Sequence, residues 1–529
     1  MDEVDILVIG GGSGGSAVAG RLSEDGRFTV ALLEAGGENR SWRIKAPGMM
    51  PFLPKSSNWQ FDTVPQRGLN GRLGYQPRGR GMGGSSAINA MLYIRGCAWD
   101  YDNWAALGCD GWAYRDVLPW FRRAEGNERG TDGFHGGDGP LAVSDQRAPN
   151  PASLAFVEAG ASLQLPRNPD FNGDRHEGIG LYQVTQKGGE RWSAARAYID
   201  PARAAGRIDV RTGALVERIL IEQGRAVGAV YRQRGRRHEV RARRAVILAG
   251  GAFGTPQTLM LSGIGPADHL AAYGIDVLVD RPAVGADLQD HIDYVAGYQS
   301  DDTGFFGTSL AGSLRFAGGV VEWFRRRTGV LTTPYAEAGG FARTRPDVAV
   351  PDVQFHFVPA LLEDHGRAKV KGQGFSCHVC VLRPESRGTV RLASADPARP
   401  PLIDPNFLDA EADVATLLAG VKLMRRILEA APMARFGGRD RHTAQVTDDA
   451  ALVAAIRARA DTVYHPVGTC RMGSDTDAVV DPRLRVRGVK GLYIADASVM
   501  PRLVSGNTNA PTIMIGERCA DFVKADLAA

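Results

Sequence analysis

Two apolar runs of strand length lie close together at the beginning of the chain. The first covers residues 6–9, the second ends at Glu34, and a helix-like segment of small residues lies between them. Uninterrupted apolar runs of this length are typical of strands that are buried on both faces, as in a parallel sheet. The pattern therefore predicts a strand–helix–strand unit at the start of an α/β fold.

Other blocks of the chain follow different patterns. Residues 151–165 and 413–428 have the periodicity of helices, and residues 353–358 resemble a strand. We expect these blocks to form a second, α+β domain under helices, built on a largely antiparallel sheet over residues 146–206 and 298–461. The first domain would then be discontinuous, and its predicted parts are residues 1–145, 207–297 and 462–529.

Gly10, Gly12 and Gly15 stand at the junction of the first strand and the helix, in the spacing Gly-x-Gly-x-x-Gly. The first glycine permits the tight bend, the second lets the backbone approach a pyrophosphate, and the third allows the helix to pack closely on the strand. Glu34 stands where a carboxylate accepts hydrogen bonds from the ribose of a dinucleotide. These residues predict a dinucleotide site, with a packed glycine turn that binds nothing as the alternative.

The chain has 529 residues, of which 44% are hydrophobic and 23% charged, and its formal net charge is +4. This length exceeds one ordinary core, which agrees with two domains. So small a charge argues against a nucleic-acid-binding protein, whose surface would carry a basic stripe. We therefore expect no nucleic acid partner.

Six cysteines are scattered along the chain, and only Cys377 and Cys380 lie close together. That pair could be half of a zinc site or a redox pair, but no second cluster accompanies it, so we favour core residues in a strand and predict no metal site. Scattered cysteines fit a reducing compartment, and the first strand begins too early for a signal peptide. We expect a cytoplasmic protein without a transmembrane helix, because no apolar run is long enough.

A second loop rich in small residues covers residues 77–91 and contains Gly83, Gly84, Ser85 and Asn89. Unpaired backbone N–H groups in such loops bind anions. A flexible linker is the other interpretation, but two basic residues and Asn89 flank the small ones. We therefore predict a second ligand-binding loop.

These motifs resemble the signatures of the glucose–methanol–choline (GMC) oxidoreductases. Residues 77–91 are similar to the flavin-contacting signature of the family, and residues 251–265 are similar to its second signature. Further similar motifs, in the order of the family, are residues 464–473, 480–482, 495–498 and 507–512. Within the family, the chain most resembles bacterial choline-dehydrogenase-like and aliphatic alcohol dehydrogenases.

The resemblance implies a Rossmann-like FAD-binding domain of the glutathione-reductase type. Some members of the family bind the flavin covalently through a histidine in the glycine–serine loop, whereas Ile88 occupies that position here, so we expect non-covalent FAD. The cofactor contacts that the resemblance implies are Gly10, Gly12, Gly15, Glu34, Gly83, Gly84, Ser85, Asn89, Val216, Asp496, Asn507 and Thr508.

His465 and Asn509 are the predicted catalytic residues. A neutral imidazole suits the removal of a hydroxyl proton near neutral pH, and an amide can donate a hydrogen bond to the same oxygen. From the residues alone, a structural histidine and a turn-forming asparagine are the commoner cases. The resemblance reverses this preference, because the family's His/Asn pair lies in these two motifs. We expect a structural position for His291 and a loop position for His365. His356 or His378 could face the substrate pocket, but we favour the core or the sheet surface for both.

The resemblance implies oxidation of a primary alcohol to the aldehyde, with proton abstraction by His465 and hydride transfer to N5 of the flavin. Likeness to dehydrogenases favours a quinone or another carrier as the electron acceptor. An oxygen-using alcohol oxidase, a hydroxynitrile-lyase-like enzyme with FAD and a non-catalytic flavin-binding protein are the alternatives. We identify no acidic and aromatic cage for a quaternary ammonium, which favours an aliphatic, aromatic or polyether alcohol over choline.

Residues 316–335 contain an apolar stretch that is followed by Arg325, Arg326 and Arg327. One interpretation is a peripheral anchor that dips into an anionic membrane and delivers electrons to a quinone. The other is a helix that packs over the mouth of the active site, with its arginines in solvent. We favour the packed helix, because one short basic cluster binds membranes only weakly.

Overall fold

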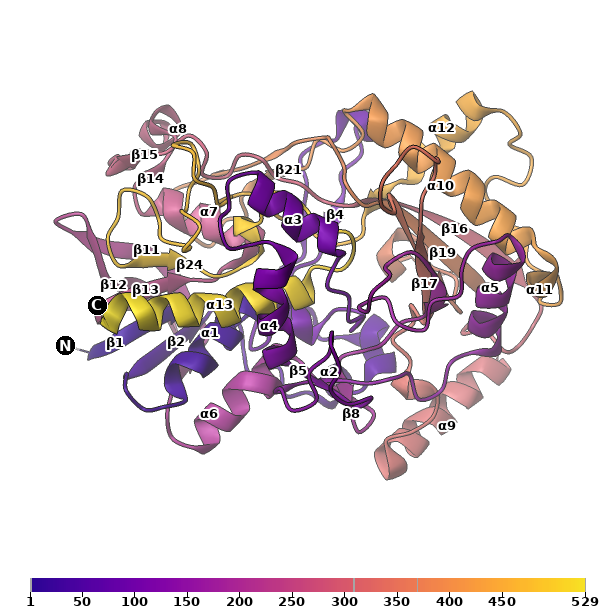
Figure 1. Cartoon of the computed structure of the whole chain (residues 1–529), viewed down its shortest axis with the longest axis horizontal. Coiled ribbons are helices and arrows are strands. Elements are labelled where there is room, and N and C mark those ends of the chain that lie inside the picture. The colour runs from indigo at the N-terminus through magenta and orange to yellow at the C-terminus, as the bar shows by residue number, and fades with distance from the viewer. Residues whose placement is uncertain (1, 308–309, 369, 529) are drawn as a thin grey trace.

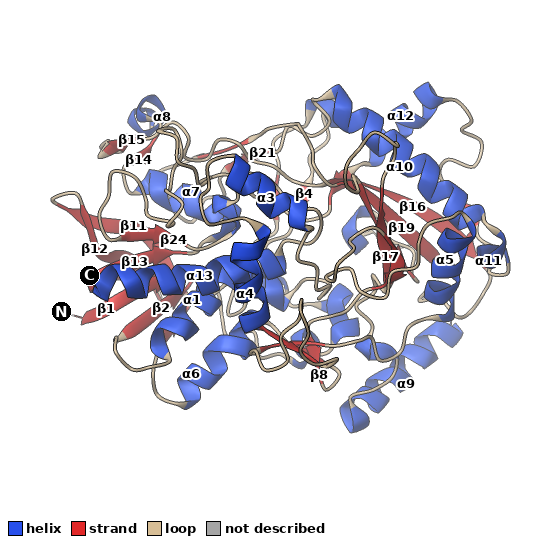
Figure 2. Ribbon diagram, viewed as in Figure 1, coloured by secondary structure: helices blue, strands red, loops and turns tan. Residues whose placement is uncertain are grey.

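Two seven-stranded sheets stand at opposite ends of the molecule, and helices pack against both (Figure 1 and Figure 2). The computed structural model describes residues 2–307, 310–368 and 370–528. The predicted domains also include positions 1, 308–309, 369 and 529, which lie outside the described residues. The first sheet is parallel at its centre, and the second is antiparallel throughout. The predicted α/β fold with a second, α+β domain is confirmed.

The first sheet has two antiparallel strands, β12 and β11, on one side of its parallel strands. β24 pairs with β13 beside the main path of the sheet. In spatial order the strands are β10 (Asp209–Thr212), β2 (Val30–Glu34), β1 (Asp2–Ile9), β13 (Arg236–Leu248), β12 (Arg225–Gln233) and β11 (Ala214–Glu222), with β24 at Leu492–Ile494.

The predicted strand–helix–strand unit is confirmed as β1, α1 (Ser13–Ser23) and β2. Residues 6–9 of β1 and all of β2 are buried, as the uninterrupted apolar runs predicted. α13 (Asn509–Ala528) packs along α1, so the last helix of the chain lies beside the first, and the two termini lie at the same end of the molecule (Figure 1). Segments about 500 residues apart in sequence therefore meet at one place.

The second sheet is covered by α5 (Pro151–Ser162), α10 (Glu411–Glu429) and α11 (Ala431–Ala434) (Figure 1). The predicted helices and strand are confirmed here, and α5 begins where Asn150 caps it ahead of a proline at the first helical position. In spatial order the strands are β22 (Arg439–Asp440), β16 (Ile292–Ser300), β19 (Gln373–Val381), β18 (Val353–Val358), β17 (Ala338–Ala342) and β7 (Gly178–Leu181), with β23 (Asp461–Thr462) paired to β16.

β16 pairs only within the second sheet, so the domain boundary that we placed after residue 297 passes through this strand. Two-stranded pairs include β8 (Gln186–Lys187) with β9 (Glu190–Arg191) and β20 (Thr389–Arg391) with β21 (Leu402–Asp404). Further helices are α2 (Trp42–Lys45), α3 (Ala98–Ala106), α4 (Tyr114–Ala124), α6 (Asp200–Ala204), α7 (Gly251–Leu261), α8 (Ala267–Ala272), α9 (Leu310–Arg326) and α12 (Asp449–Arg459).

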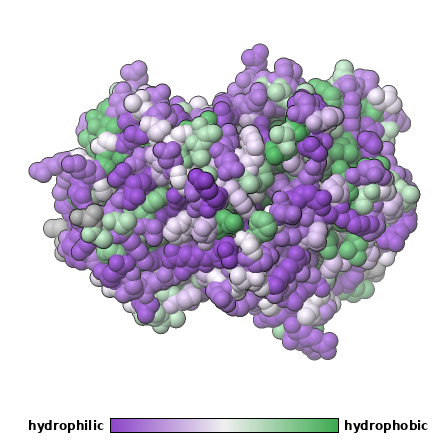
Figure 3. Space-filling view, viewed as in Figure 1, coloured by the Kyte–Doolittle hydropathy of each residue, from purple (hydrophilic) through white to green (hydrophobic). Residues whose placement is uncertain are grey.

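The face of the molecule in Figure 3 is mostly hydrophilic, with apolar residues in scattered patches. Over the described ranges, no helix combines the length and the apolar character needed to cross a bilayer. Cys377 and Cys380 are buried in β19, which confirms the interpretation as core residues, and all six cysteines are free.

Candidate active site

The two predicted glycine loops face each other. Gly83 donates its backbone N–H to the carbonyl oxygen of Gly11 at 2.8 Å. Gly84 has φ of +50°, and a Cβ atom there would lie 2.7 Å from the Cα of Gly12, so only glycine allows this approach. A Cβ atom on Gly12, by contrast, would meet nothing within 4 Å. The loops thus leave an open space that is walled by backbone rather than by side chains.

Two helix N-termini meet beside this space. α1 begins after Gly12, and its first intrahelical bond runs from Ser16 to Gly12, so the preceding N–H groups have no partner within the helix. α13 begins at Asn509, whose Oδ1 accepts a hydrogen bond from Ser13 Oγ at 2.7 Å. Because the positive ends of both helix dipoles come together here, the space suits an anionic group such as a pyrophosphate.

The carboxylate of Glu34 holds both loops to the end of β2. Its Oε2 accepts the N–H of Gly11, and its Oε1 accepts the N–H groups of Gly36 and Gly81, each at 2.8 Å. Glu34 is buried. The residue that we predicted as a ribose contact therefore also organises the loops that surround the cofactor space.

Hydrogen bonds to neighbouring protein groups hold the side chains of Asn89 and Ser85 in place. Asn89 Oδ1 accepts hydrogen bonds from Met91 N at 3.0 Å and from Arg191 Nη1 at 2.9 Å. Ser85 Oγ accepts the N–H of Gly79 at 3.1 Å. Arg191 is a residue that our sequence reasoning missed, and it holds the segment on which the predicted flavin contacts lie.

Three further predicted cofactor residues lie outside the two glycine loops. Asp496 accepts the N–H of Gly251 at the start of α7 at 2.9 Å, which joins the second signature to the C-terminal part of the chain. Val216 is buried in β11. Thr508 accepts the N–H of Thr512 in the first turn of α13, at 3.1 Å.

His465 lies at the centre of a buried group of polar side chains. Its Nε2 is 3.1 Å from the side-chain nitrogen of Asn507, and its Nδ1 is 2.9 Å from Nδ1 of His291. Asn507 is two residues from Asn509, so the segment between them joins the histidine to the glycine loops. The predicted catalytic His and the predicted cofactor loops are thus neighbours.

A chain of hydrogen bonds fixes the tautomer of His465. His291 Nε2 donates to the carbonyl oxygen of Leu382 at 3.0 Å, and burial lowers the pKa of His291 to about 3, so this imidazole is neutral and its Nδ1 is an acceptor. His465 must then carry its proton on Nδ1 and donate it to His291. The lone pair of His465 Nε2 is consequently directed to the side where Asn507 lies.

Asn507, rather than Asn509, is the amide that reaches His465. Gln354 Nε2 donates to Asn507 Oδ1 at 3.2 Å, which turns the NH₂ group of Asn507 toward His465 Nε2. Asn509 instead accepts the hydroxyl of Ser13 at the start of α1. The geometry therefore brings together a different pair from the His465–Asn509 pair that we predicted.

The backbone that carries His465 is held under strain. His465 N donates to Asp290 Oδ1 at 2.8 Å, and Arg78 Nη2 donates to the carbonyl oxygen of Tyr464 at 2.6 Å. Tyr464 has φ of +76°, a conformation that costs a side-chain-bearing residue about 1–3 kcal/mol and persists only where the surroundings fix it. The imidazole is thus preorganised in one position.

Burial lowers the pKa of His465 well below its usual range, and the adjacent His291, His356 and Arg78 lower it further. Burial also lowers the pKa of His356 to about 3, and neither of its ring nitrogens has a hydrogen-bond partner within the described residues. We had expected His356 to be structural, but a buried imidazole without partners beside Asn507 is suited to contact a substrate. The sequence feature that could have predicted this contact is the alternation of His356 with apolar neighbours in β18. The same alternation is also typical of core positions.

Two further histidines, His378 in β19 and His365 in the loop between β18 and β19, have partners. His378 Nδ1 is 2.6 Å from Asp293 Oδ2, and His365 lies between Tyr464 and Asp461. Within the described ranges, no three histidine, cysteine or acidic residues are placed to hold a metal ion. The arrangement can accept a proton at His465 and bind an oxygen beside Asn507.

Residues 4–293 match the N-terminal region of the GMC oxidoreductase family, and residues 384–516 match its C-terminal region. The chain is 44% identical to an alcohol dehydrogenase (acceptor) of Pseudomonas putida, over 99% of this chain and 96% of the relative. It is also 44% identical to the mitochondrial choline dehydrogenase of Homo sapiens, over 99% and 90%. The solved structure of pyridoxine 4-oxidase from Mesorbium loti superposes with a TM-score of 0.88 at 31% identity, over 98% of both chains. The chain, with its two glycine loops and its buried histidine, thus belongs to the GMC oxidoreductase family.

Proposed function

We propose that the protein oxidises a primary alcohol to the aldehyde, with His465 as the base. The observation that carries this proposal is the tautomer of His465, which leaves its Nε2 unprotonated. In the structure this nitrogen accepts a hydrogen bond from the amide of Asn507, and a substrate hydroxyl would replace that donor. Displaced from Nε2, the amide of Asn507 would donate to the same oxygen and stabilise the negative charge that develops on it. His356 is placed to bind the substrate from the side of β18.

FAD-dependent oxidation of alcohols, the predicted reaction, is the activity of this family. The residues fit the cofactor, because two helix N-termini and an open glycine backbone form a site for its pyrophosphate. Bound FAD supplies the hydride acceptor, N5 of its ring. Ile88 in place of a histidine supports non-covalent binding, and we propose that FAD is released when the protein is denatured.

We propose an uncharged alcohol as the substrate and a quinone as the acceptor. The buried carboxylates near His465 are already engaged, Asp290 by the backbone of His465 and Asp293 by His378, so neither is free to bind a quaternary ammonium. The likeness to an acceptor-dependent alcohol dehydrogenase supports the quinone. Free cysteines throughout the chain support a cytoplasmic location.

Anaerobic mixing with a panel of alcohols, choline included, tests this proposal. An aliphatic or aromatic primary alcohol should bleach the flavin absorbance, and a quinone analogue should restore it faster than oxygen does. Bleaching by choline alone would contradict the substrate class, and faster recovery with oxygen would favour an oxidase. If no alcohol bleaches the flavin while a cyanohydrin is cleaved, the protein is a lyase.

The low pKa of His465 predicts that activity persists into mild acid. Only the neutral imidazole can accept a proton, so the rate of flavin reduction should be lost only as the pH falls through a pKa well below 6.5. We expect the rate constant at pH 6 to stay within about twofold of its value at pH 8, whereas an ordinary histidine would be about three-quarters protonated at pH 6. Stopped-flow reduction across this range checks it. Burial raises the pKa of Asp290 to about 6, so this carboxyl group also titrates in the range measured. The pH series is therefore repeated in Asp290→Asn, which separates the titration of Asp290 from that of His465.

Removal of the hydrogen-bond acceptor behind His465 should disturb its tautomer. His291→Leu leaves the Nδ1 proton of His465 buried without a partner, and we expect flavin reduction to slow about tenfold or more with FAD retained. His291→Asn restores an acceptor oxygen and should recover most of the rate. Equal rates in the two variants, measured by stopped flow, would assign His291 a packing role only.

A further inference from the structure

α9 presents apolar side chains on two opposite faces. On one face Trp323 is buried, and its ring lies 6.5 Å from that of Trp42 in α2. Leu314 and Val321, two turns apart, lie on the opposite side and are 67% and 51% exposed. Phe324 lies between the two faces, with its ring 5.3 Å from that of Trp323, and is 50% exposed. A surface helix normally has a single apolar face that meets the core, so this second face needs another explanation.

A further exposed apolar side chain belongs to the neighbouring 3₁₀ segment at Pro47–Phe52 and lies at the edge of the buried face of α9. Phe52 is 51% exposed, and its ring lies 5.6 Å from that of Phe316 in α9. We call the exposed side chains of Phe52, Leu314, Val321 and Phe324 the α9 surface. Large apolar side chains that gather on one surface mark an interaction site, whereas single ones need no explanation.

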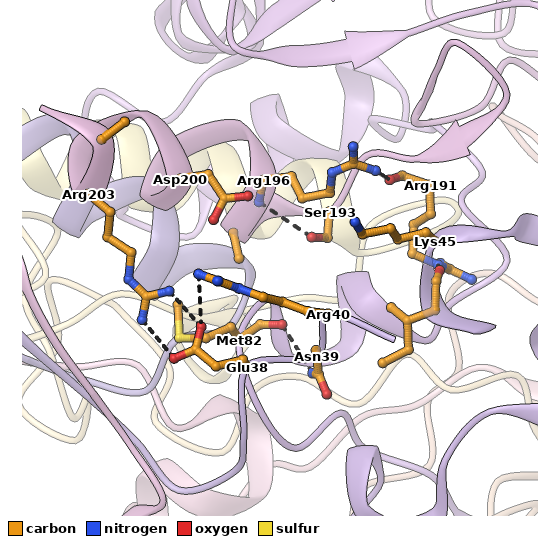
Figure 4. Close-up of a pocket in the computed structure, with 13 residues that line it drawn as sticks. Glu38, Asn39, Arg40, Lys45, Met82, Arg191, Ser193, Arg196, Asp200 and Arg203 are labelled. Carbon is orange, nitrogen blue, oxygen red and sulfur yellow. Dashed lines mark hydrogen bonds and ion pairs between the residues drawn. The ribbon is translucent and has the colours of Figure 1, made fainter. Parts of the chain in front are cut away.

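Figure 4 shows a cationic cavity of about 560 Å³ near the glycine loops. Glu190 links this cavity to α9, because it forms ion pairs with Arg327, next to the end of α9, and with Arg196 in the cavity wall. The nearly fully buried Arg191 contributes an Nη2 that has no hydrogen-bond partner. Two carboxylates, Glu38 and Asp200, share the wall with five cations, which are Arg40, Lys45, Arg191, Arg196 and Arg203. Arg40 and Arg203 form ion pairs with Glu38, so the cavity has an excess of positive charge after these pairs are formed.

We propose that the α9 surface and this cavity dock on an anionic phospholipid bilayer. Exposed apolar side chains insert into the boundary of the acyl chains, while cations bind lipid phosphates, and stable binding needs both signals together. Arg325 and Arg326 are exposed, and no carboxylate within the described ranges pairs with them. Anionic lipid complements this charge, and a bilayer would contain the quinone. Only the link to the quinone rests on the proposed function; the docking itself does not.

Co-sedimentation with vesicles tests the proposal in the FAD-loaded, full-length protein without substrate. We expect binding to vesicles of phosphatidylcholine with about 30% phosphatidylglycerol, and little binding to phosphatidylcholine alone. Two double variants, Leu314→Glu with Val321→Glu and Arg325→Glu with Arg326→Glu, should each lower the partition coefficient about tenfold or more. Leu278→Glu, a control at a side chain that is 55% exposed elsewhere, should leave it unchanged.

Three results would overturn the proposal. They are no binding to anionic vesicles, equal binding by wild type and both double variants, and a dimer in sedimentation velocity that Leu314→Glu with Val321→Glu converts to a monomer. The last result would assign the α9 surface to a second copy of the chain. Alcohol oxidation with a soluble dye should be the same in all four proteins. Its absence from all four would count against the proposed function and leave the vesicle result valid.

Discussion

Replacement of His465 by alanine should leave FAD bound and slow its reduction by alcohol about a hundredfold or more. The variant removes the imidazole whose unprotonated Nε2 lies 3.1 Å from the side-chain nitrogen of Asn507, and general base catalysis typically contributes about 10²–10⁴-fold. The glycine loops and helix N-termini that fit the cofactor do not include His465, so the flavin spectrum should persist. Anaerobic stopped-flow spectroscopy measures both quantities in one experiment.

His365→Ala is the matched control for this variant. His365 bonds to the hydroxyl of Tyr464, the residue before His465, but its partners do not include His465 itself. Disturbance of the local backbone would slow both variants alike, whereas loss of a base slows His465→Ala alone. If His465→Ala reduces its flavin as fast as the wild type does, the assigned role of His465 is wrong.

The fold could be predicted from patterns that arise within single elements. The apolar run of β1, the small residues of α1 and the apolar end of β2 follow one another in sequence, and their periodicity reports burial directly. Strand β18 was predicted with its observed bounds for the same reason. The predicted boundary after residue 297 passes through β16, whose pairing partners lie far along the chain, so the local pattern does not locate it.

The site could be predicted only in part, because side-chain direction depends on where a helix begins. Asn507 and Asn509 share one motif, and nothing in their spacing says which one turns toward His465. The structure separates them, since α13 starts at Asn509 while Asn507 precedes the helix and meets Gln354. His291 and Arg191 were missed for a related reason. Their roles depend on partners such as His465 and Asn89, which come from remote parts of the chain.

Gly12→Val should give a folded protein that contains no flavin. Gly12 has φ of −73°, which valine can adopt, and a Cβ atom there meets nothing within 4 Å, so the apoprotein has room for the change. The space that the valine fills is the one between the two loops, where the pyrophosphate of FAD is proposed to bind. We therefore expect a colourless protein with a circular dichroism spectrum and a melting temperature close to those of wild-type apoprotein.

Gly133→Val separates loss of the cofactor from the general effect of valine in a glycine loop. Gly133 is exposed, lacks a positive φ, and also has nothing within 4 Å of its Cβ position, but it lies outside both predicted cofactor loops. This variant should purify yellow, with the flavin content of the wild type. Retention of FAD by Gly12→Val would show that the pyrophosphate does not lie in the open space at Gly12, and the placement of the cofactor against His465 would lose its basis. Unfolding of Gly12→Val would contradict the open space itself, because the valine must then collide with protein atoms that the structure places farther away.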